Sequence, residues 1–361
     1  MCAAIWPSFR RIATLIVVLA AGTAVAACGD RLRMGLPSGP PALVDSAVVA
    51  ADGTDLPLRR WLPDDGRPPR ALILALHGYN DHANAFDSAA SYWADRGIAT
   101  FAYDQRGFGR HDSRGIWSSV EALSSDAAAA LWLLHDAYPN TPLYLLGHSM
   151  GGAVAMTVAT GTGSPGLTGP PLDGVILVAP AIWARETMPG YQRLALEIGA
   201  LTVPGLRVSP DGLGIVPSDN LEMLRALGRD PLVLKNSRID ALDGLVTLMD
   251  RAYRSAPDVP TSTLMLYGDR EEVVPLDTVD LMLARLQPGR FTLAFYENGY
   301  HMLLRDLQAR IVWDDILAWI VTVGGPLPSG ADRRGDERHS ALFDGRSVQT
   351  AGPIGRTEAN D

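Results

Sequence analysis

Residues 143–160, LYLLGHSMGGAVAMTVAT, decide how this 361-residue chain folds. The stretch begins with four residues suited to a buried strand, passes through Gly147-His148-Ser149-Met150-Gly151, and ends in small residues suited to a helix. A GxSxG pattern between a strand and a helix predicts a turn whose glycines leave no room for a Cβ and whose serine hydroxyl stands above the sheet. We therefore expect Ser149 to be a nucleophile.

Short, mostly apolar runs recur along the chain, separated by helix-length segments. They cover residues 71–76, 98–103, 143–146, 174–179, 263–267 and 291–296, and shorter β patterns at 46–50 and 56–61 precede them. Such runs suit strands buried on both faces, and their alternation with helices predicts a parallel sheet. We predict an α/β fold with flanking helices, its core formed by residues 44–183 and 261–323.

One interval breaks the alternation. The segment 184–260 is far longer than the usual connection of about 2 to 6 residues between a helix and a strand. They contain helix-like segments at 191–201, 221–227 and 239–253, which predict an inserted helical cap. Residues 324–361 carry Gly, Pro, Arg and Asp with few apolar residues, which predicts a disordered tail.

An acid and a histidine follow Ser149 in the order that a serine nucleophile of this type requires. Asp269 comes directly after the run 263–267, and His301 comes directly after the last run. Both therefore fall at the carboxyl ends of strands, where catalytic groups gather in such sheets. We expect His301 to be the general base and Asp269 to orient it. Three other acids compete for the second role: Glu271, Glu272 and Asp277.

The loop after residues 71–76 supplies backbone donors. It reads His77-Gly78-Tyr79, and we assign the oxyanion hole to the N–H groups of Tyr79 and Met150, the residue after the serine. The remaining histidines lack the spacing of metal ligands, and no glycine motif for a dinucleotide follows a strand. We expect neither a metal nor a cofactor.

The N-terminus has the pattern of an export signal. Arg10 and Arg11 precede an uncharged apolar run within residues 1–28, which ends in small residues and Cys28. This end resembles a bacterial lipobox, so we predict that Cys28 is lipidated and that the protein is anchored in the cell envelope. Secretion after cleavage near Ala27 and an uncleaved membrane anchor are the alternatives. Residues 29–43, rich in Gly and Pro, predict a tether to the membrane.

The composition sets broad limits. The chain is 47% apolar and 20% charged, which is typical of a globular protein with a large core. Its net charge is −9 and no basic cluster is present in the region that should fold. Nucleic acid is therefore an unfavourable partner.

Several motifs resemble the monoacylglycerol lipase and lysophospholipase-like branch of the α/β hydrolases. The similar stretches are His77-Gly78 with Asp81-His82, 147–152, Asp230-Pro231-Leu232, 267–269 and 299–303. The resemblance implies the α/β-hydrolase fold and a serine esterase acting on single-chain lipid esters such as monoacylglycerol or lysophospholipid, with a cap that forms the acyl site. For that site we select the apolar residues of the cap, Trp183, Met188, Tyr191, Leu194, Ile198 and Leu201.

Other functions stay open on the same residues. An esterase of other small esters, a peptidase or an acyltransferase would use the same serine, acid and histidine. An inactive lipoprotein of the envelope that binds lipid is the candidate from another class. Aspartate-based hydrolases of this fold are disfavoured, because the residue at the turn is Ser149.

Overall fold

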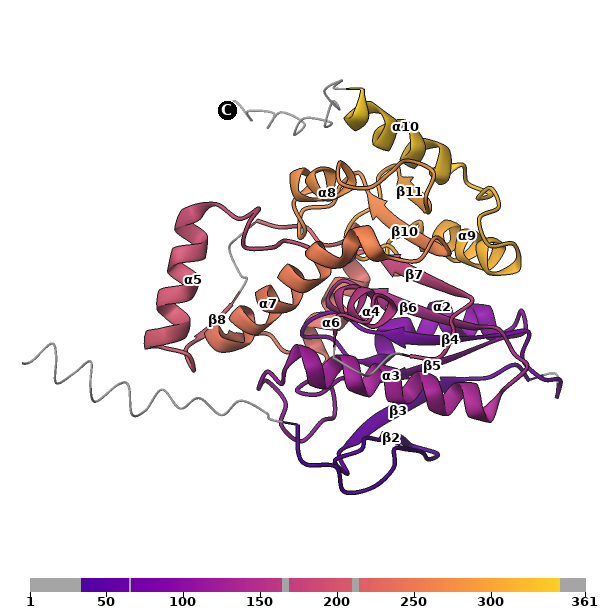
Figure 1. Cartoon of the computed structure of the whole chain (residues 1–361), viewed down its shortest axis with the longest axis horizontal. Helices are drawn as coiled ribbons and strands as arrows, with labels where there is room; N and C mark the ends of the chain where they lie inside the picture. Colours follow the sequence, from indigo (N-terminus) through magenta and orange to yellow (C-terminus); the bar gives the residue numbers. More distant parts are fainter. Residues whose placement is uncertain (1–33, 65, 164–168, 210–213, 345–361) are drawn as a thin grey trace, which may run out of the picture.

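The computed structural model describes residues 34–64, 66–163, 169–209 and 214–344 (Figure 1). Its described strands form a central sheet in the order β1-β2-β3-β5-β4-β6-β7-β10-β11. The strands are β1 (Ala42–Leu43), β2 (Ala47–Val49), β3 (Asp55–Trp61), β4 (Ala71–Leu76), β5 (Ile98–Tyr103), β6 (Leu143–His148), β7 (Gly174–Val178), β10 (Thr263–Gly268) and β11 (Thr292–Tyr296). Strands β4, β5, β6, β7, β10 and β11 run parallel, whereas β1, β2 and β3 pair antiparallel with their neighbours. The predicted α/β fold is confirmed.

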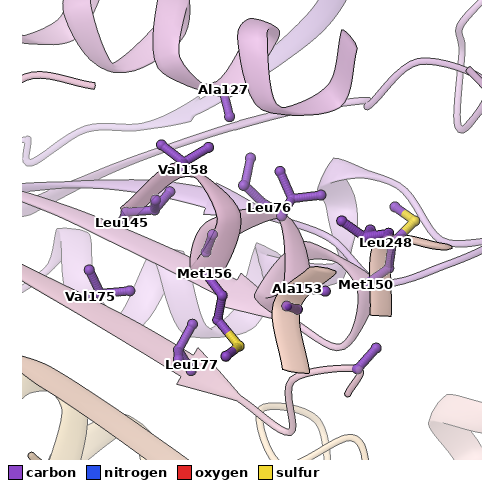
Figure 2. Close-up of a cluster of buried hydrophobic side chains, with 14 of the residues drawn as sticks. Leu76, Ala127, Leu145, Met150, Ala153, Met156, Val158, Val175, Leu177 and Leu248 are labelled. Carbon is purple, nitrogen blue, oxygen red and sulfur yellow. The ribbon is translucent and has the colours of Figure 1, made fainter. Parts of the chain in front are cut away.

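Helices cover both faces of the sheet because its central strands are apolar on both sides. In β4, Leu72, Leu74 and Leu76 pack on one face, and Ile73 packs on the other. The helices of the first face are α3 (Val120–Ala137), α4 (Met150–Ala159) and α8 (Leu276–Leu283); those of the second are α2 (Asp87–Ala94), which follows the short η1 (Ala83–Phe86), and α9 (Ala309–Val321). Figure 2 shows α4 packed into the core of the first face.

Between β7 and β10 lie the elements of the expected cap. They are α5 (Gly190–Thr202), β8 (Arg207–Val208), α6 (Leu221–Arg229), β9 (Ser237–Arg238), α7 (Ile239–Ser255) and η2 (Ala256–Asp258). Helix α7 packs against α4 and α5 (Figure 1). Helix α5 stands at the left edge of the molecule in Figure 1 and has no buried residue.

The predicted disordered tail is wrong for residues 331–343, which form α10 (Ala331–Phe343). This helix lies so close to β11 that a Cβ on Gly335 would come within 2.1 Å of the carbonyl oxygen of Leu293. Arg338 forms an ion pair with Asp280 at 2.7 Å. Small residues and arginines make these contacts, so hydropathy alone underestimated the helix. Residues 345–361 of the predicted tail lie outside the described residues.

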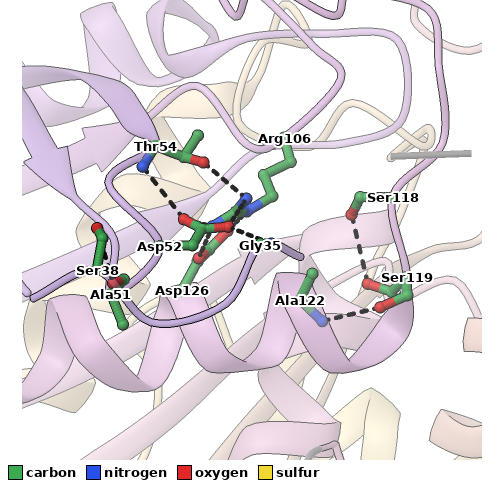
Figure 3. Close-up of polar contacts among 10 residues, drawn as sticks. All are labelled: Gly35, Ser38, Ala51, Asp52, Thr54, Arg106, Ser118, Ser119, Ala122 and Asp126. Atoms are coloured by element: carbon green, nitrogen blue, oxygen red, sulfur yellow. Dashed lines mark hydrogen bonds and ion pairs between the residues drawn. The ribbon is translucent and has the colours of Figure 1, made fainter. Parts of the chain in front are cut away.

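The predicted tether is wrong near its end. Strand β1 pairs with β2, and the N–H of Gly35 donates to the Asp52 carboxylate at 2.9 Å. The Arg106 guanidinium donates to Asp52 and to Asp126 of α3 (Figure 3), so it ties the first hairpin to the core and holds the pKa of Asp52 well below its usual range. The export signal and Cys28 lie outside the described residues. No helix in the described ranges is long and apolar enough to span a bilayer.

Candidate active site

Ser149 occupies the sharp turn between β6 and α4. Its backbone has φ +51° and ψ −117°, a conformation that costs a non-glycine residue about 1 to 3 kcal/mol. The turn also needs its glycines: a Cβ on Gly147 would lie 2.2 Å from the carbonyl oxygen of Gly151, and one on Gly151 would lie 2.0 Å from that of Leu76. Hydrogen bonds hold the turn, with the Ser149 N–H donating to Val178 at 3.0 Å.

His301 is held by a buried carboxylate. Its Nδ1 lies 2.7 Å from Oε2 of Glu271, whose side chain is fully buried. The other carboxylate oxygen, Oε1, accepts the N–H groups of Val273 at 2.7 Å and Val274 at 3.0 Å. Every bond to this carboxylate favours a negative charge, so Nδ1 of His301 carries the proton and Nε2 is left to act as a base.

The assignment of Asp269 as the orienting acid is wrong. Its carboxylate is 36% exposed and faces Arg270, 3.9 Å from Nε, and its Oδ1 has no hydrogen-bond partner. Burial raises the pKa of Asp269. Glu271 takes the position because the loop after β10 turns back toward His301 only beyond Asp269, where Arg270 N–H donates to Gly299. Glu271 was among the competing acids, whereas Glu272 binds the N–H of Val216 instead.

Backbone from two elements surrounds Ser149. A Cβ on Gly78 would lie 3.3 Å from Cβ of Ser149, so the segment that leads to Tyr79 runs directly beside the serine. On the other side, Met150 is the first residue of α4 and has no partner for its N–H within the helix. Both residues expected to form the oxyanion hole are therefore neighbours of Ser149.

His148 is structural. Its Nε2 donates to the carbonyl oxygen of His301 at 3.1 Å, and the two rings lie 5.1 Å apart. Burial, together with the nearby His301 and Arg305, lowers the pKa of His148 to about 3. The ring is therefore neutral at physiological pH and braces the loop that carries His301.

A cavity of about 1000 Å³ opens over Ser149 and His301, large enough for a lipid chain. Most of its lining is apolar; α7 contributes Leu242, Leu245, Val246 and Met249, and the segment after β7 contributes Trp183 and Met188. Asp81 and Arg305 lie at the cavity wall as well. In the described ranges, no three His, Cys, Asp or Glu residues are grouped as metal ligands would be.

The prediction of acyl-site residues is wrong for four of the six. Tyr191, Leu194, Ile198 and Leu201 do not line the cavity and are 73%, 56%, 52% and 76% exposed. They lie along one outward stripe of α5. Helix α5 contributes Gln192 and Leu196 to the lining instead, and α7 contributes Leu242, Leu245, Val246 and Met249. Tyr79 reaches the cavity, and its ring also packs edge-on against Phe108 at 5.4 Å.

The fold and this site agree with the comparisons with known proteins. Residues 67–308 match the Hydrolase_4 family, described as serine aminopeptidase, S33, and the chain belongs to that family. It is a serine hydrolase of the α/β-hydrolase fold.

Particular relatives are lipases. The chain is 27% identical over 279 residues to monoglyceride lipase of Homo sapiens, covering 76% of this chain and 89% of that protein. It is 26% identical over 266 residues to monoacylglycerol lipase of Mycolicibacterium smegmatis, covering 73% and 91%. The crystal structure of Paleococcus ferrophilus monoacylglycerol lipase has the same fold, with a TM-score of 0.61, 21% identity and coverage of 74% of this chain and 98% of that one.

Proposed function

We propose that this enzyme hydrolyses the ester bond of monoacylglycerols through an acyl-enzyme on Ser149. One observation carries the proposal: Ser149 and His301 open into a cavity of about 1000 Å³ with a mainly apolar lining, and His301 is bonded to a buried carboxylate. The relatives named monoglyceride or monoacylglycerol lipase support the choice of substrate.

In acylation, Nε2 of His301 takes the proton of the Ser149 hydroxyl while Oγ attacks the ester carbonyl. The new oxyanion is stabilised by the N–H groups of Tyr79 and Met150. His301 then gives its proton to the glycerol oxygen, the C–O bond breaks, and glycerol leaves. Glu271 stabilises the imidazolium through the 2.7 Å hydrogen bond to Nδ1.

In deacylation, His301 takes a proton from water, and the hydroxide oxygen attacks the acyl carbonyl. Collapse of the second tetrahedral intermediate returns the proton to Oγ of Ser149 and releases the fatty acid. The alkyl chain lies against α7, where each buried methylene contributes about 0.8 kcal/mol to binding.

A peptidase is the second candidate, because the family description names an aminopeptidase. Recognition of a substrate ammonium group calls for an unpaired carboxylate near the serine. Among the described lining residues the only carboxylate is that of Asp81. Its Oδ2 already forms an ion pair with Nη2 of Arg305 at 2.5 Å. The cavity therefore favours a neutral lipid ester.

A substrate panel separates these functions. We expect the purified enzyme to release glycerol from 1-oleoylglycerol with a kcat/KM at least tenfold above that for trioleoylglycerol, and to leave amino-acid p-nitroanilides intact. Ser149-dependent cleavage of the anilides in preference to 1-oleoylglycerol would identify a peptidase.

We also propose that the enzyme is a lipoprotein of the cell envelope, anchored through Cys28. The charged start, apolar run and final cysteine of residues 1–28 support this placement. Two or more acyl chains on Cys28 would hold the enzyme stably at a membrane, where its substrates collect. Native protein should partition into the detergent phase of Triton X-114, and the Cys28→Ser variant should not. Native protein found only in the aqueous phase would point to secretion.

A further inference from the structure

An ion pair lies in the wall of the catalytic cavity, and the reaction steps make no use of it. Nη2 of Arg305 donates to Oδ2 of Asp81 at 2.5 Å, and the two side chains are only 14% and 8% exposed. The other oxygen of Asp81 accepts the N–H of His82 at 2.9 Å. The Arg305 guanidinium forms no further hydrogen bond with a described residue, so it has N–H groups to spare for a ligand in the cavity.

The ion pair and the apolar lining reach the cavity from opposite faces of the sheet. Ala83, two residues after Asp81, and Leu304, the neighbour of Arg305, pack in the core of the face that α2 and α9 cover, so the ion pair lies toward that face. Helix α7 packs on α4, on the other face. Ser149 stands between them, where β6 ends. A lipid ester with its chain along α7 therefore has its alcohol portion near Asp81 and Arg305.

The charges of the Asp81 carboxylate and the Arg305 guanidinium cancel, so this part of the cavity wall has no net charge. Asp81 and Arg305 are the only Asp, Glu, Lys or Arg residues among the described lining residues, and burial keeps the neighbouring His148 neutral. Arg305 and, less strongly, other partners lower the pKa of Asp81 against the opposing effect of its burial, so the carboxylate stays ionised at neutral pH. A phosphate in this region would meet the Asp81 carboxylate and would compete with it for Arg305.

We propose that Asp81 and Arg305 form a charge-balanced site for the alcohol portion of the substrate, which accepts a neutral polyol and rejects a phosphorylated one. The guanidinium donates to hydroxyl oxygens, and the carboxylate accepts from hydroxyl groups. The inference rests on the proposed ester hydrolysis and distinguishes monoacylglycerol from lysophospholipid, the two substrate classes that the resemblance left open.

Two substrates test the idea, because they differ only in the phosphate: 1-oleoylglycerol and 1-oleoylglycerol 3-phosphate. Wild-type enzyme should have a kcat/KM at least tenfold higher for the neutral ester. In Asp81→Asn the unpaired Arg305 should attract phosphate, and the ratio should move at least tenfold toward the phosphorylated ester. The control Asp136→Asn removes an equal charge from the exposed surface of α3 and should keep the wild-type ratio.

The double variant Asp81→Asn/Arg305→Gln covers the case in which the single variant does not fold. It removes both charges, so its ratio should stay within threefold of the wild-type value. Equal wild-type rates on the two substrates would overturn the inference, as would an unchanged ratio in Asp81→Asn. Either result leaves the proposed function standing, whereas loss of Ser149-dependent hydrolysis of both esters in the wild type would refute that function itself.

Discussion

At the scale of single residues, Glu271 has the position that a triad acid needs, since its Oε2 lies 2.7 Å from Nδ1 of His301. Glu271→Gln keeps the shape but removes the charge that fixes the imidazole tautomer. We expect kcat on p-nitrophenyl butyrate to fall about 10³ to 10⁴-fold. Asp269→Asn is the matched control and should retain activity within a few-fold. A large loss in Asp269→Asn with little change in Glu271→Gln would restore the original assignment.

The sequence identified Ser149 and His301 but not the acid, for a physical reason. Few other residues could be the nucleophile or the base, because the serine lies between two close-packed glycines and the histidine follows the last strand. The acid depends on how the loop after β10 bends. That bend is set by the hydrogen bond from Arg270 to Gly299, a contact between residues far apart in sequence.

His148 should make stability depend on pH. Its pKa in the folded state is about 3, below the value of about 6.5 for an unfolded chain. Below about pH 6.5 the unfolded state binds a proton that the folded state does not, so the free energy of unfolding falls as pH decreases, by up to about 1.4 kcal/mol per unit. In urea denaturation, the free energy of unfolding of His148→Gln should decline less steeply between pH 7.5 and 5 than that of the wild type. The control His135→Gln should keep the wild-type slope. Equal slopes in all three proteins would contradict the buried neutral ring.

At the scale of elements, the turn between β6 and α4 depends on glycine packing. A Cβ at position 151 would meet the carbonyl oxygen of Leu76 at 2.0 Å, and backbone cannot move aside cheaply. Gly151→Ala should therefore lower the free energy of unfolding by several kcal/mol. Gly228 in α6 has open space around it, so Gly228→Ala should raise stability by about 0.5 to 1 kcal/mol. Thermal unfolding should give a much lower melting temperature for Gly151→Ala than for Gly228→Ala. Similar melting temperatures in the two variants would refute this prediction.

Helices and strands with regularly spaced apolar residues could be predicted from the sequence. The buried runs became β4, β5, β6, β7, β10 and β11, and the cap helices lie where periodicity placed them, because burial of those faces stabilises each element. Helix α10 was missed, since it packs through Gly335 and arginine side chains. Such contacts depend on the partner surface of β11, which local hydropathy does not encode.

At the scale of the whole molecule, α7 contributes four residues to the lining of the acyl cavity, whereas α5 contributes Gln192 and Leu196 and exposes Leu194 to solvent. Leu245 lines the cavity, so Leu245→Trp should shorten it and reduce kcat/KM for p-nitrophenyl palmitate at least tenfold more than for the acetate. Leu194 is exposed on α5, so Leu194→Trp should leave the ratio of the two esters within twofold. The opposite pattern would place the acyl chain along the exposed stripe of α5. Sequence alone could not tell which face of each cap helix meets the cavity.

Covalent labelling combined with product release tests whether Ser149 is the nucleophile. Incubation with a fluorophosphonate should add one adduct, which mass spectrometry of the digested protein places on Ser149, and should abolish glycerol release from 1-oleoylglycerol. Ser149→Ala should show neither labelling nor release while keeping the wild-type circular dichroism spectrum. An adduct on another residue, or glycerol release by Ser149→Ala at the wild-type rate, would contradict the assignment of Ser149 as the nucleophile.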